Sequence, residues 1–368
     1  MPSGVLQGER LSISSSLKEH LDKFDIRIGT LECAVGKALN ENVEKYKDNK
    51  EVCVWVQPDS LLTLKELKVD VVSLANNHVG DLGKEGLIES MKVLDELSIK
   101  YCGAGLNKKE AARPVVFEQD EETYAFIAVC QKNKASLGSV QYADSENWGV
   151  FGYDDEVASY IKFLKEEYDY VFVITHWGVE FKWIPEEIVC AYAKVMIDAG
   201  ADGIIGGHPH QIQPLIIYKN KPIYYSLGNF LFPEIFVDDN CNVFYPSKKV
   251  GNELPSFERF PIGRKFSMKY YWTPMGRKSM IANISINDSK IRATYSLAQL
   301  NNLRLIQNES DIILRIKIIV FNILYRNLSR EFARKLNKCI SILKSWYFYK
   351  IKSLFNSKYR FYKYVGKK

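Results

Sequence analysis

Short apolar runs alternate with amphipathic segments along most of the chain. The apolar runs are unbroken and rich in β-branched residues, which is typical of strands buried on both faces. They predict strands at 26–31, 69–74, 100–102, 123–130, 170–175, 203–205 and 222–226. Apolar residues at helical spacing predict helices at 15–23, 84–97 and 185–199. Because strands and helices alternate, the predicted fold class is α/β.

The pattern changes twice beyond Phe232. Residues 233–278 are rich in Asp, Asn, Gly and Pro, which predicts an irregular excursion. Two β-prone runs on either side of Asn287 predict a hairpin of 279–286 and 290–296. An apolar segment at 312–325 predicts a helix, and aromatic residues then interleave with lysine and arginine. We therefore predict a domain over 1–305 and a basic, aromatic-rich helical tail over 306–368.

The formal net charge of +6 conceals an asymmetry. Residues 312–368 hold 15 Lys or Arg and one acid, Glu331, which gives this segment +14 and leaves −8 for the rest. Such a tail can lie on an anionic membrane surface, stack on single-stranded nucleic acid, or dock on the body or on a partner subunit. We expect no nucleic acid, because the body is acidic and carries no nucleic-acid motif.

The cysteines and the apolar runs indicate the cellular compartment in which the protein is expected. The seven cysteines form no CxxC pair, which predicts reduced thiols in a reducing compartment. We find no signal-peptide pattern and no run of the ~20 apolar residues that a membrane-spanning helix needs. The expected location is the cytoplasm, with peripheral attachment at the inner face of the membrane if the tail binds there.

Four of the five histidines directly follow predicted strands, in polar or glycine-rich turns: His78, His176, His208 and His210. Open α/β sheets place ligand sites at the carboxyl ends of their strands. One histidine alone more often fills a polar niche, which is our interpretation of His20. Histidines arriving from three separate strands favour a shared metal site, since neutral imidazole binds Mn, Fe and Zn.

Oxygen ligands accompany these histidines. Asn77 offers a carbonyl oxygen and Glu32 a carboxylate, and both follow buried strands. Mixed oxygen and nitrogen ligands suit a hydrolytic site with two divalent ions, whose identity among Mn, Fe and Zn stays open. Arg113 is a candidate contact for an anionic substrate or a helix-end ion pair. Asn229 lies in a turn that either lines the pocket or is an ordinary β-turn.

Two tryptophans flank the histidines. Trp177 and Trp183 either pack in the core or form an aromatic wall for a polymeric substrate.

Several motifs, in order, resemble those of the CapA family, the capsule and poly-γ-glutamate synthesis proteins with a calcineurin-like metallophosphoesterase fold. The resemblance covers about 21–232 and is carried by Asn76-Asn77-His78, Gly103-Ala104-Gly105 with Ala111-Ala112-Arg113-Pro114, His176-Trp177-Gly178, Gly206-Gly207-His208-Pro209-His210 and Ser226-Leu227-Gly228-Asn229-Phe230. It implies a four-layer αββα sandwich with metal-binding loops at one end.

The resemblance also implies roles. Asn77, His176 and His208 would be metal ligands, and His210 would bind the neighbouring ion. His78, with Asn77 beside it, would be catalytic, as a proton donor to a leaving group or a phosphate contact. Glu32 matches the family's Asn-Leu-Glu element.

The sequence departs from the family pattern twice. Thr30 replaces the asparagine of the Asn-Leu-Glu element. No Gly-Asp strand precedes the matched segment, so we expect either a misplaced gene start or the loss of the first strand and one metal ligand.

Three functions follow from these observations. The first is a metal-dependent hydrolase acting on a phosphoester or on a capsule or polyglutamate intermediate. The second is a non-catalytic subunit of a membrane-associated polymer synthesis or export complex. The third is a nucleotidase or phosphodiesterase of general metabolism, for which we identify no nucleoside pocket.

Overall fold

The computed structural model describes residues 12–36, 54–132, 140–232, 235–237, 243–244, 268–270, 276–301, 304–309 and 311–327. Two compact units divide the chain, Met1–Asn322 and Ile323–Lys368. Of the second unit, only the end of helix α8 (Ile312–Asn327) is described. Most of the predicted tail therefore lies outside the described residues, and the predicted boundary at residue 305 stays a prediction.

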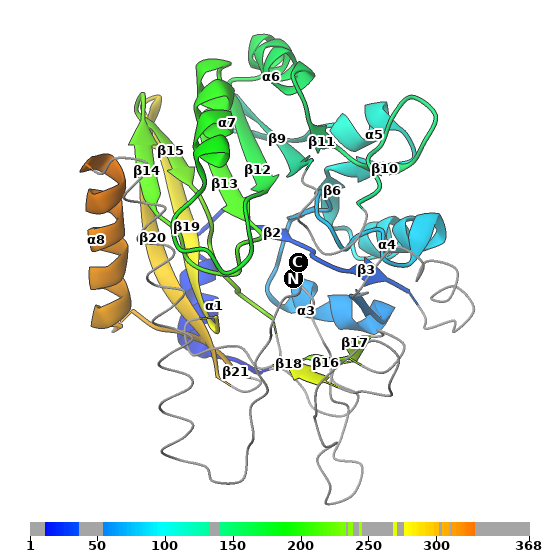
Figure 1. The fold of residues 1–368 in the computed structure, drawn as a ribbon, viewed down its shortest axis with the longest axis horizontal. Helices are drawn as coiled ribbons and strands as arrows, with labels where there is room; N and C mark the ends of the chain where they lie inside the picture. Colours follow the sequence, from blue (N-terminus) through cyan, green and yellow to red (C-terminus); the bar gives the residue numbers. More distant parts are fainter. Residues whose placement is uncertain are drawn as a thin grey trace, which may run out of the picture. The chain divides into compact units, whose positions relative to one another are not determined.

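A large mixed sheet forms the centre of the first unit (Figure 1). Its strand order is β11 (Gly152–Tyr153), β9 (Glu122–Gln131), β12 (Tyr170–His176), β13 (Gly203–Gly207), β15 (Lys221–Tyr224) and β14 (Leu215–Tyr218), with β8 (Val115–Gln119) also paired to β9. Neighbours from β11 to β15 are parallel, whereas β14 and β8 pair antiparallel. Every residue of β12 is buried, as its unbroken apolar run predicts.

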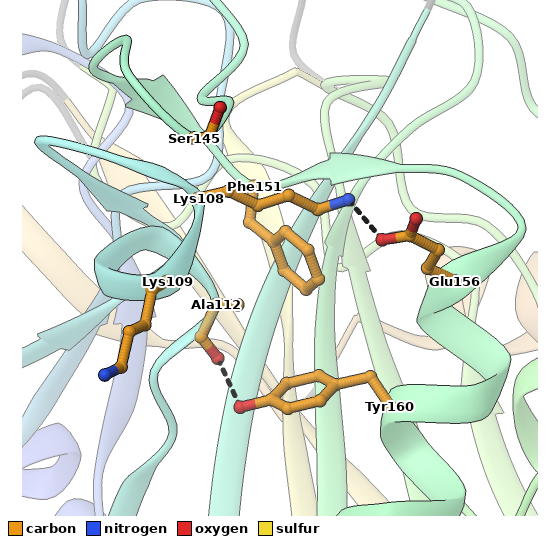
Figure 2. A pocket seen from close by; sticks show the side chains of 7 residues that line it. All are labelled: Lys108, Lys109, Ala112, Ser145, Phe151, Glu156 and Tyr160. Carbon is orange, nitrogen blue, oxygen red and sulfur yellow. Dashed lines mark hydrogen bonds and ion pairs between the residues drawn. The ribbon is translucent and has the colours of Figure 1, made fainter.

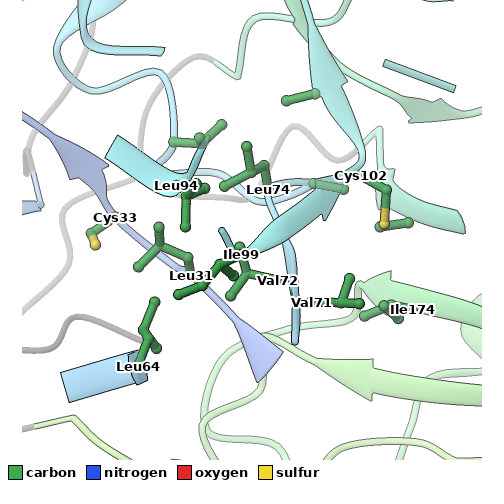
Figure 3. Close-up of a cluster of buried hydrophobic side chains, with 14 of the residues drawn as sticks. Leu31, Cys33, Leu64, Val71, Val72, Leu74, Leu94, Ile99, Cys102 and Ile174 are labelled. Carbon is green, nitrogen blue, oxygen red and sulfur yellow. The ribbon is translucent and has the colours of Figure 1, made fainter. Parts of the chain in front are cut away.

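A second, parallel sheet has the order β2 (Ile28–Thr30), β5 (Val71–Ser73) and β6 (Lys100–Cys102). Its side chains share one buried cluster with the large sheet, where Val71 and Leu31 accompany Phe172 and Ile174 of β12 (Figure 3). Because the two sheets bury apolar faces in the same cluster, they are held together by the hydrophobic effect. Helices α3 (Leu62–Glu66) and α4 (Gly83–Glu96) contribute Leu64 and Leu94.

Helices α6 (Glu156–Glu167) and α7 (Glu187–Asp198) pack beside the large sheet (Figure 1). The prediction placed the start of α7 at Pro185, but Glu186 is still extended, with φ −76° and ψ 157°, so the helix begins at Glu187, two residues later. Pro185 therefore lies just before the N-cap residue, Glu186, and outside the helix.

The predicted hairpin is present as β19 (Lys278–Asn287) and β20 (Lys290–Asn301). It belongs to a sheet of order β1 (Ser12–Ile13), β21 (Arg304–Gln307), β20 and β19. The remaining short elements are α1 (Ser15–Leu21), β3 (Ala34–Val35), β4 (Trp55–Val56), η2 (Pro58–Leu61), β7 (Ala104–Gly105), α5 (Lys108–Ala112) and β10 (Gly149–Val150).

The predicted excursion at 233–278 is only partly described. It contributes a small sheet of order β17 (Val243–Phe244), β16 (Ile235–Val237) and β18 (Met268–Tyr270), and its other residues up to 275 lie outside the described ranges. The α/β class predicted from the sequence is confirmed.

The cysteines in the described ranges are present as thiols and not as disulfides, at Cys33, Cys102, Cys130 and Cys190. Burial raises the pKa of the first three to about 12, so these thiols stay protonated and unreactive at neutral pH. In the same ranges, no helix combines the length and apolarity needed to cross a membrane.

Candidate metal centre

Strand register brings the predicted ligands to one edge of the two sheets. In the large sheet, His176 is level with both Cys130 and Gly207, so His208 begins the loop directly after its strand. In the small sheet, Thr30 is level with Ser73, and the loops that follow carry the other candidates. Parallel strands end on the same side, which is why residues distant in sequence converge here.

Contacts across this edge join the two sheets. Asn77 Oδ1 lies 2.7 Å from His176 Nε2. Glu32 Oε1 lies 3.5 Å from His176 Nε2 and 3.6 Å from His210 Nε2. One carboxylate and one amide from the small sheet therefore face two imidazoles from the large sheet.

Two overlapping groups of ligand atoms result. Within the first group, atoms of Glu32, His176 and His208 lie within 4.8 Å of one another. A second group, with the same spacing, consists of Glu180, His208 and His210. All of the metal ligands predicted from the sequence thus come together, and His208 is common to both groups.

The backbone at two of these histidines is strained. His208 has φ +93° and His210 has φ +52°, in the left-handed region that residues other than glycine rarely adopt. Such conformations cost about 1–3 kcal/mol each and cluster at functional sites. The strain turns consecutive ligands of one short loop toward the same centre.

Gly206 has no room for a side chain. A Cβ there would lie 2.2 Å from the Tyr225 carbonyl oxygen and 2.6 Å from Trp177 Nε1. The Trp177 indole donates a hydrogen bond to that same carbonyl, at 2.8 Å. At Gly207, by contrast, the nearest atom to an added Cβ is the Thr175 carbonyl oxygen, at 3.8 Å.

We therefore expect Gly206→Ala to lower the free energy of unfolding by about 2 kcal/mol or more, because the Trp177–Tyr225 contact must open. Gly207→Ala is the matched control and should cost less than about 1 kcal/mol. Urea unfolding of both variants measures the difference. Equal losses in the two variants would contradict the close approach at Gly206.

Burial keeps the central imidazoles neutral. It lowers the pKa of His208 to about 3, with a further contribution from the nearby His210 and His78. The pKa of His176 is held well below its ordinary value, again chiefly by burial and then by His208 and His210. Burial also raises the pKa of the Glu180 carboxyl. A neutral imidazole is the form that binds a metal ion.

Several buried atoms at the centre lack a hydrogen-bond partner among the described residues: Glu32 Oε1, His176 Nδ1 and His208 Nδ1. Buried polar atoms left unsatisfied are costly, so native structures rarely keep them unless something else binds there. The donor set of imidazole nitrogen and carboxylate oxygen suits Mn, Fe or Zn. These residues therefore fit a divalent metal ion.

His78 stands beside the ligand groups with its ring fixed by a fully buried carboxylate. Its Nδ1 lies 2.7 Å from Asp81 Oδ2, which also accepts the backbone N–H of Val54 at 2.5 Å. This contact with the Asp81 carboxyl sets the orientation of the His78 ring. Asn76 secures the same loop, since its Oδ1 accepts the N–H groups of His78 and Val79 and its Nδ2 donates to the Leu31 carbonyl.

Asn229 lies behind His210. Its Oδ1 is 2.8 Å from His210 Nδ1, and its Nδ2 donates to the Gly276 carbonyl oxygen at 2.9 Å. The structure thus gives Asn229 a positioning contact, and the predicted contact with substrate stays a prediction. Held in this way, His210 presents Nε2 toward Glu32.

Sequence reasoning missed several residues of the site. Asn76 lies within a motif that resembles the family, and Asp81 and Glu180 lie two or three residues beyond such a motif, but nothing in their type alone separates them from surface positions. Gln131 is a further case. Its Oε1 accepts the N–H of Gly178 at 2.7 Å, and only the register of β9 against β12 reveals this.

The other candidate residues from the sequence belong to neither ligand group. Arg113 is exposed at the end of α5 and belongs to neither ligand group, so its role as a substrate contact stays a prediction. Trp177 is buried and hydrogen-bonded, in keeping with core packing. Trp183 lies under the Lys317 ammonium, which is 3.2 Å from the ring centroid.

Of two hollows in the described part of the chain, the smaller adjoins the candidate ligands and the larger does not. A cavity of about 10 Å³, room for about one water molecule, borders the candidate ligands and is lined by Asn77, Cys130, Gln131, His176, Trp177, Gly178 and His208. A larger hollow of about 350 Å³ is lined by Lys108, Lys109, Ala112, Ser145, Phe151, Glu156 and Tyr160 (Figure 2). In it Lys108 is paired with Glu156 at 2.5 Å and with Asp154 at 3.2 Å, and no predicted ligand lines it.

Comparisons with known proteins point to one family. The family model described as bacterial capsule synthesis protein PGA_cap matches residues 10–234. The chain is 35% identical to the capsule biosynthesis protein CapA of Bacillus anthracis over 205 residues, which are 53% of this chain and 48% of that protein. It is 31% identical to the PGA biosynthesis protein CapA of Bacillus subtilis over 231 residues, which are 60% of this chain and 59% of that protein.

Among solved structures, a hypothetical protein from Thermus thermophilus superposes with a TM-score of 0.45 at 15% identity, covering 79% of this chain and 97% of that one. The chain spans about half the length of the two curated relatives named above.

Proposed function

Since the chain belongs to the PGA_cap family of bacterial capsule synthesis proteins, we propose that it serves capsule or poly-γ-glutamate synthesis as a metal-dependent hydrolase of a phosphoester or polymer intermediate. The observation that carries this proposal is the convergence of Glu32, Asn77, His176, His208 and His210 at the joined edge of two sheets.

Two divalent ions complete the proposed site. Glu32, Asn77, His176 and His208 would hold one, and His210 with Glu180 would hold the neighbouring one. Divalent ions in such sites polarise a phosphoryl oxygen and make hydroxide available at neutral pH.

The side chains of this chain supply the remaining chemistry. His78 would give a proton to the oxygen of the leaving group as the ester bond breaks. Asp81 would hold the His78 ring in place through the 2.7 Å contact at Nδ1 and stabilise its protonated form. Asn229 would fix the tautomer of His210 in the same way.

We also propose that the two sheets are the inner layers of a four-layer αββα sandwich. What supports this arrangement is the single apolar cluster shared by the two sheets, with α6 and α7 packed beside the large one. Ligand loops at the carboxyl ends of the strands are the expected location for the site in such a fold.

Hydrolysis of bis(p-nitrophenyl) phosphate and p-nitrophenyl phosphate by the full chain tests the function. With Mn²⁺ present we expect turnover of at least one ester, its loss with EDTA, and its return when Mn²⁺ is restored. A chain that binds Mn²⁺ but cleaves neither ester would contradict the hydrolase proposal and favour a non-catalytic subunit of a synthesis complex.

A further inference from the structure

Helix α8 is apolar on two sides. On the inner side, Leu314 and Ile318 are buried against Leu215, Tyr224 and Leu297 of the large sheet and the hairpin. Asn322 Oδ1 accepts the backbone N–H of Leu215 at 3.1 Å, which ties the helix to β14 at this residue. The orientation of the helix at these residues is therefore set by packing.

The outer side carries aliphatic side chains in contact with solvent. Ile312, Ile316, Ile319 and Val320 are 68%, 55%, 52% and 43% exposed. Their spacing of four, three and one residues places them on one face, which we call the α8 stripe. Contiguous exposed aliphatics of this kind mark an interaction surface.

The two cations of α8 whose side chains the structure describes already have partners. Arg315 forms an ion pair with Glu309 and lies over the Tyr295 ring, 5.8 Å from its centroid. Lys317 lies over Trp183. The sequence that follows the helix supplies further positive charge.

That sequence is strongly basic and aromatic. Residues 328–368 contain 12 Lys or Arg against one acid, Glu331. They also contain six Trp or Tyr residues, the two types that are enriched at the boundary between lipid and water. Basic residues beside a membrane are attracted to its anionic headgroups.

We propose that the α8 stripe docks on an anionic lipid membrane. Stable attachment to a bilayer takes two signals, and here they are adjacent in the chain: aliphatic side chains that enter the interface and a basic segment that binds headgroups. A second copy of the chain is the less suitable occupant, because two segments of the same high positive charge would meet. This inference is independent of the proposed catalytic activity.

Flotation with vesicles tests the surface. The full chain is mixed with vesicles of phosphatidylcholine alone or of phosphatidylcholine with phosphatidylglycerol. We expect binding only to the anionic vesicles, and a loss of about tenfold or more in the partition coefficient for the combined variant Ile312→Gln, Ile316→Gln and Ile319→Gln. The matched control Leu62→Gln, Ile188→Gln and Val195→Gln replaces similarly exposed aliphatics elsewhere and should bind like the unaltered chain.

Other results would overturn the proposal. Unchanged vesicle binding of the α8 variant would show that the stripe takes no part, and equal binding to both kinds of vesicle would exclude an anionic surface. Absence of vesicle binding, together with a dimer in sedimentation equilibrium that the α8 variant abolishes, would identify the stripe as an interface between copies. Circular dichroism of both variants verifies that they remain folded.

Discussion

Replacing His208 by asparagine is expected to weaken Mn²⁺ binding by more than about 100-fold, since even the loss of a residue that merely orients a ligand costs about 10- to 100-fold. His208 belongs to both groups of ligand atoms, so its replacement removes a ligand atom from each group. Asparagine tolerates the positive φ of this position, so the backbone of the loop should be kept. The pKa of about 3 makes His208 a neutral ligand throughout the physiological range.

Titration calorimetry of the metal-free protein with Mn²⁺ measures this effect. His20→Asn is the control, because His20 lies on α1 and belongs to neither ligand group. We expect it to bind Mn²⁺ like the unaltered chain. Retention of full affinity and stoichiometry in His208→Asn would contradict the assigned ligand set.

Replacing His78 by glutamine is expected to lower kcat for phosphoester hydrolysis by about 10²- to 10⁴-fold while leaving Mn²⁺ stoichiometry unchanged. The reason is that His78 is placed beside the ligand groups, outside both of them, with its ring held by Asp81. A proton donor matters most when the leaving group is a poor one. The loss should therefore be larger for an alkyl phosphodiester than for a p-nitrophenyl ester.

Asp81→Asn separates positioning from catalysis. It keeps the size of the buried side chain but withdraws the negative charge that stabilises protonated His78. In this variant too we expect kcat to fall more for a poor leaving group than for a good one, but the loss should be smaller than in His78→Gln. An equal loss for good and poor leaving groups in both variants would argue against proton donation by His78.

Much of the fold was predictable from local pattern. The predicted strand at 170–175 is β12, one residue longer, because an unbroken apolar run leaves few alternatives to a buried strand. The hairpin around Asn287 followed from its turn chemistry. The ends of elements were harder to predict, as at α7, where the boundary depends on the backbone angles of Glu186.

The candidate ligands of the site could be predicted from the sequence, but the hydrogen bonds that support them could not. His176 and His208 could be identified because strand ends converge in parallel sheets. The contact of Asn229 with His210 and that of Gln131 with Gly178 depend on tertiary register, which no local pattern encodes. Glu180 could be assigned to a ligand group only from its distance to His208 and His210.

The central claim is that ligands from the two sheets hold divalent metal at their joined edge. Anomalous diffraction from crystals of the full chain grown with Mn²⁺ tests it most directly. We predict an anomalous peak bounded by Glu32, His176 and His208, with a second beside His210 and Glu180. An anomalous map with no Mn²⁺ peak among these five residues, whether or not Mn²⁺ is bound elsewhere in the crystal, would contradict the claim.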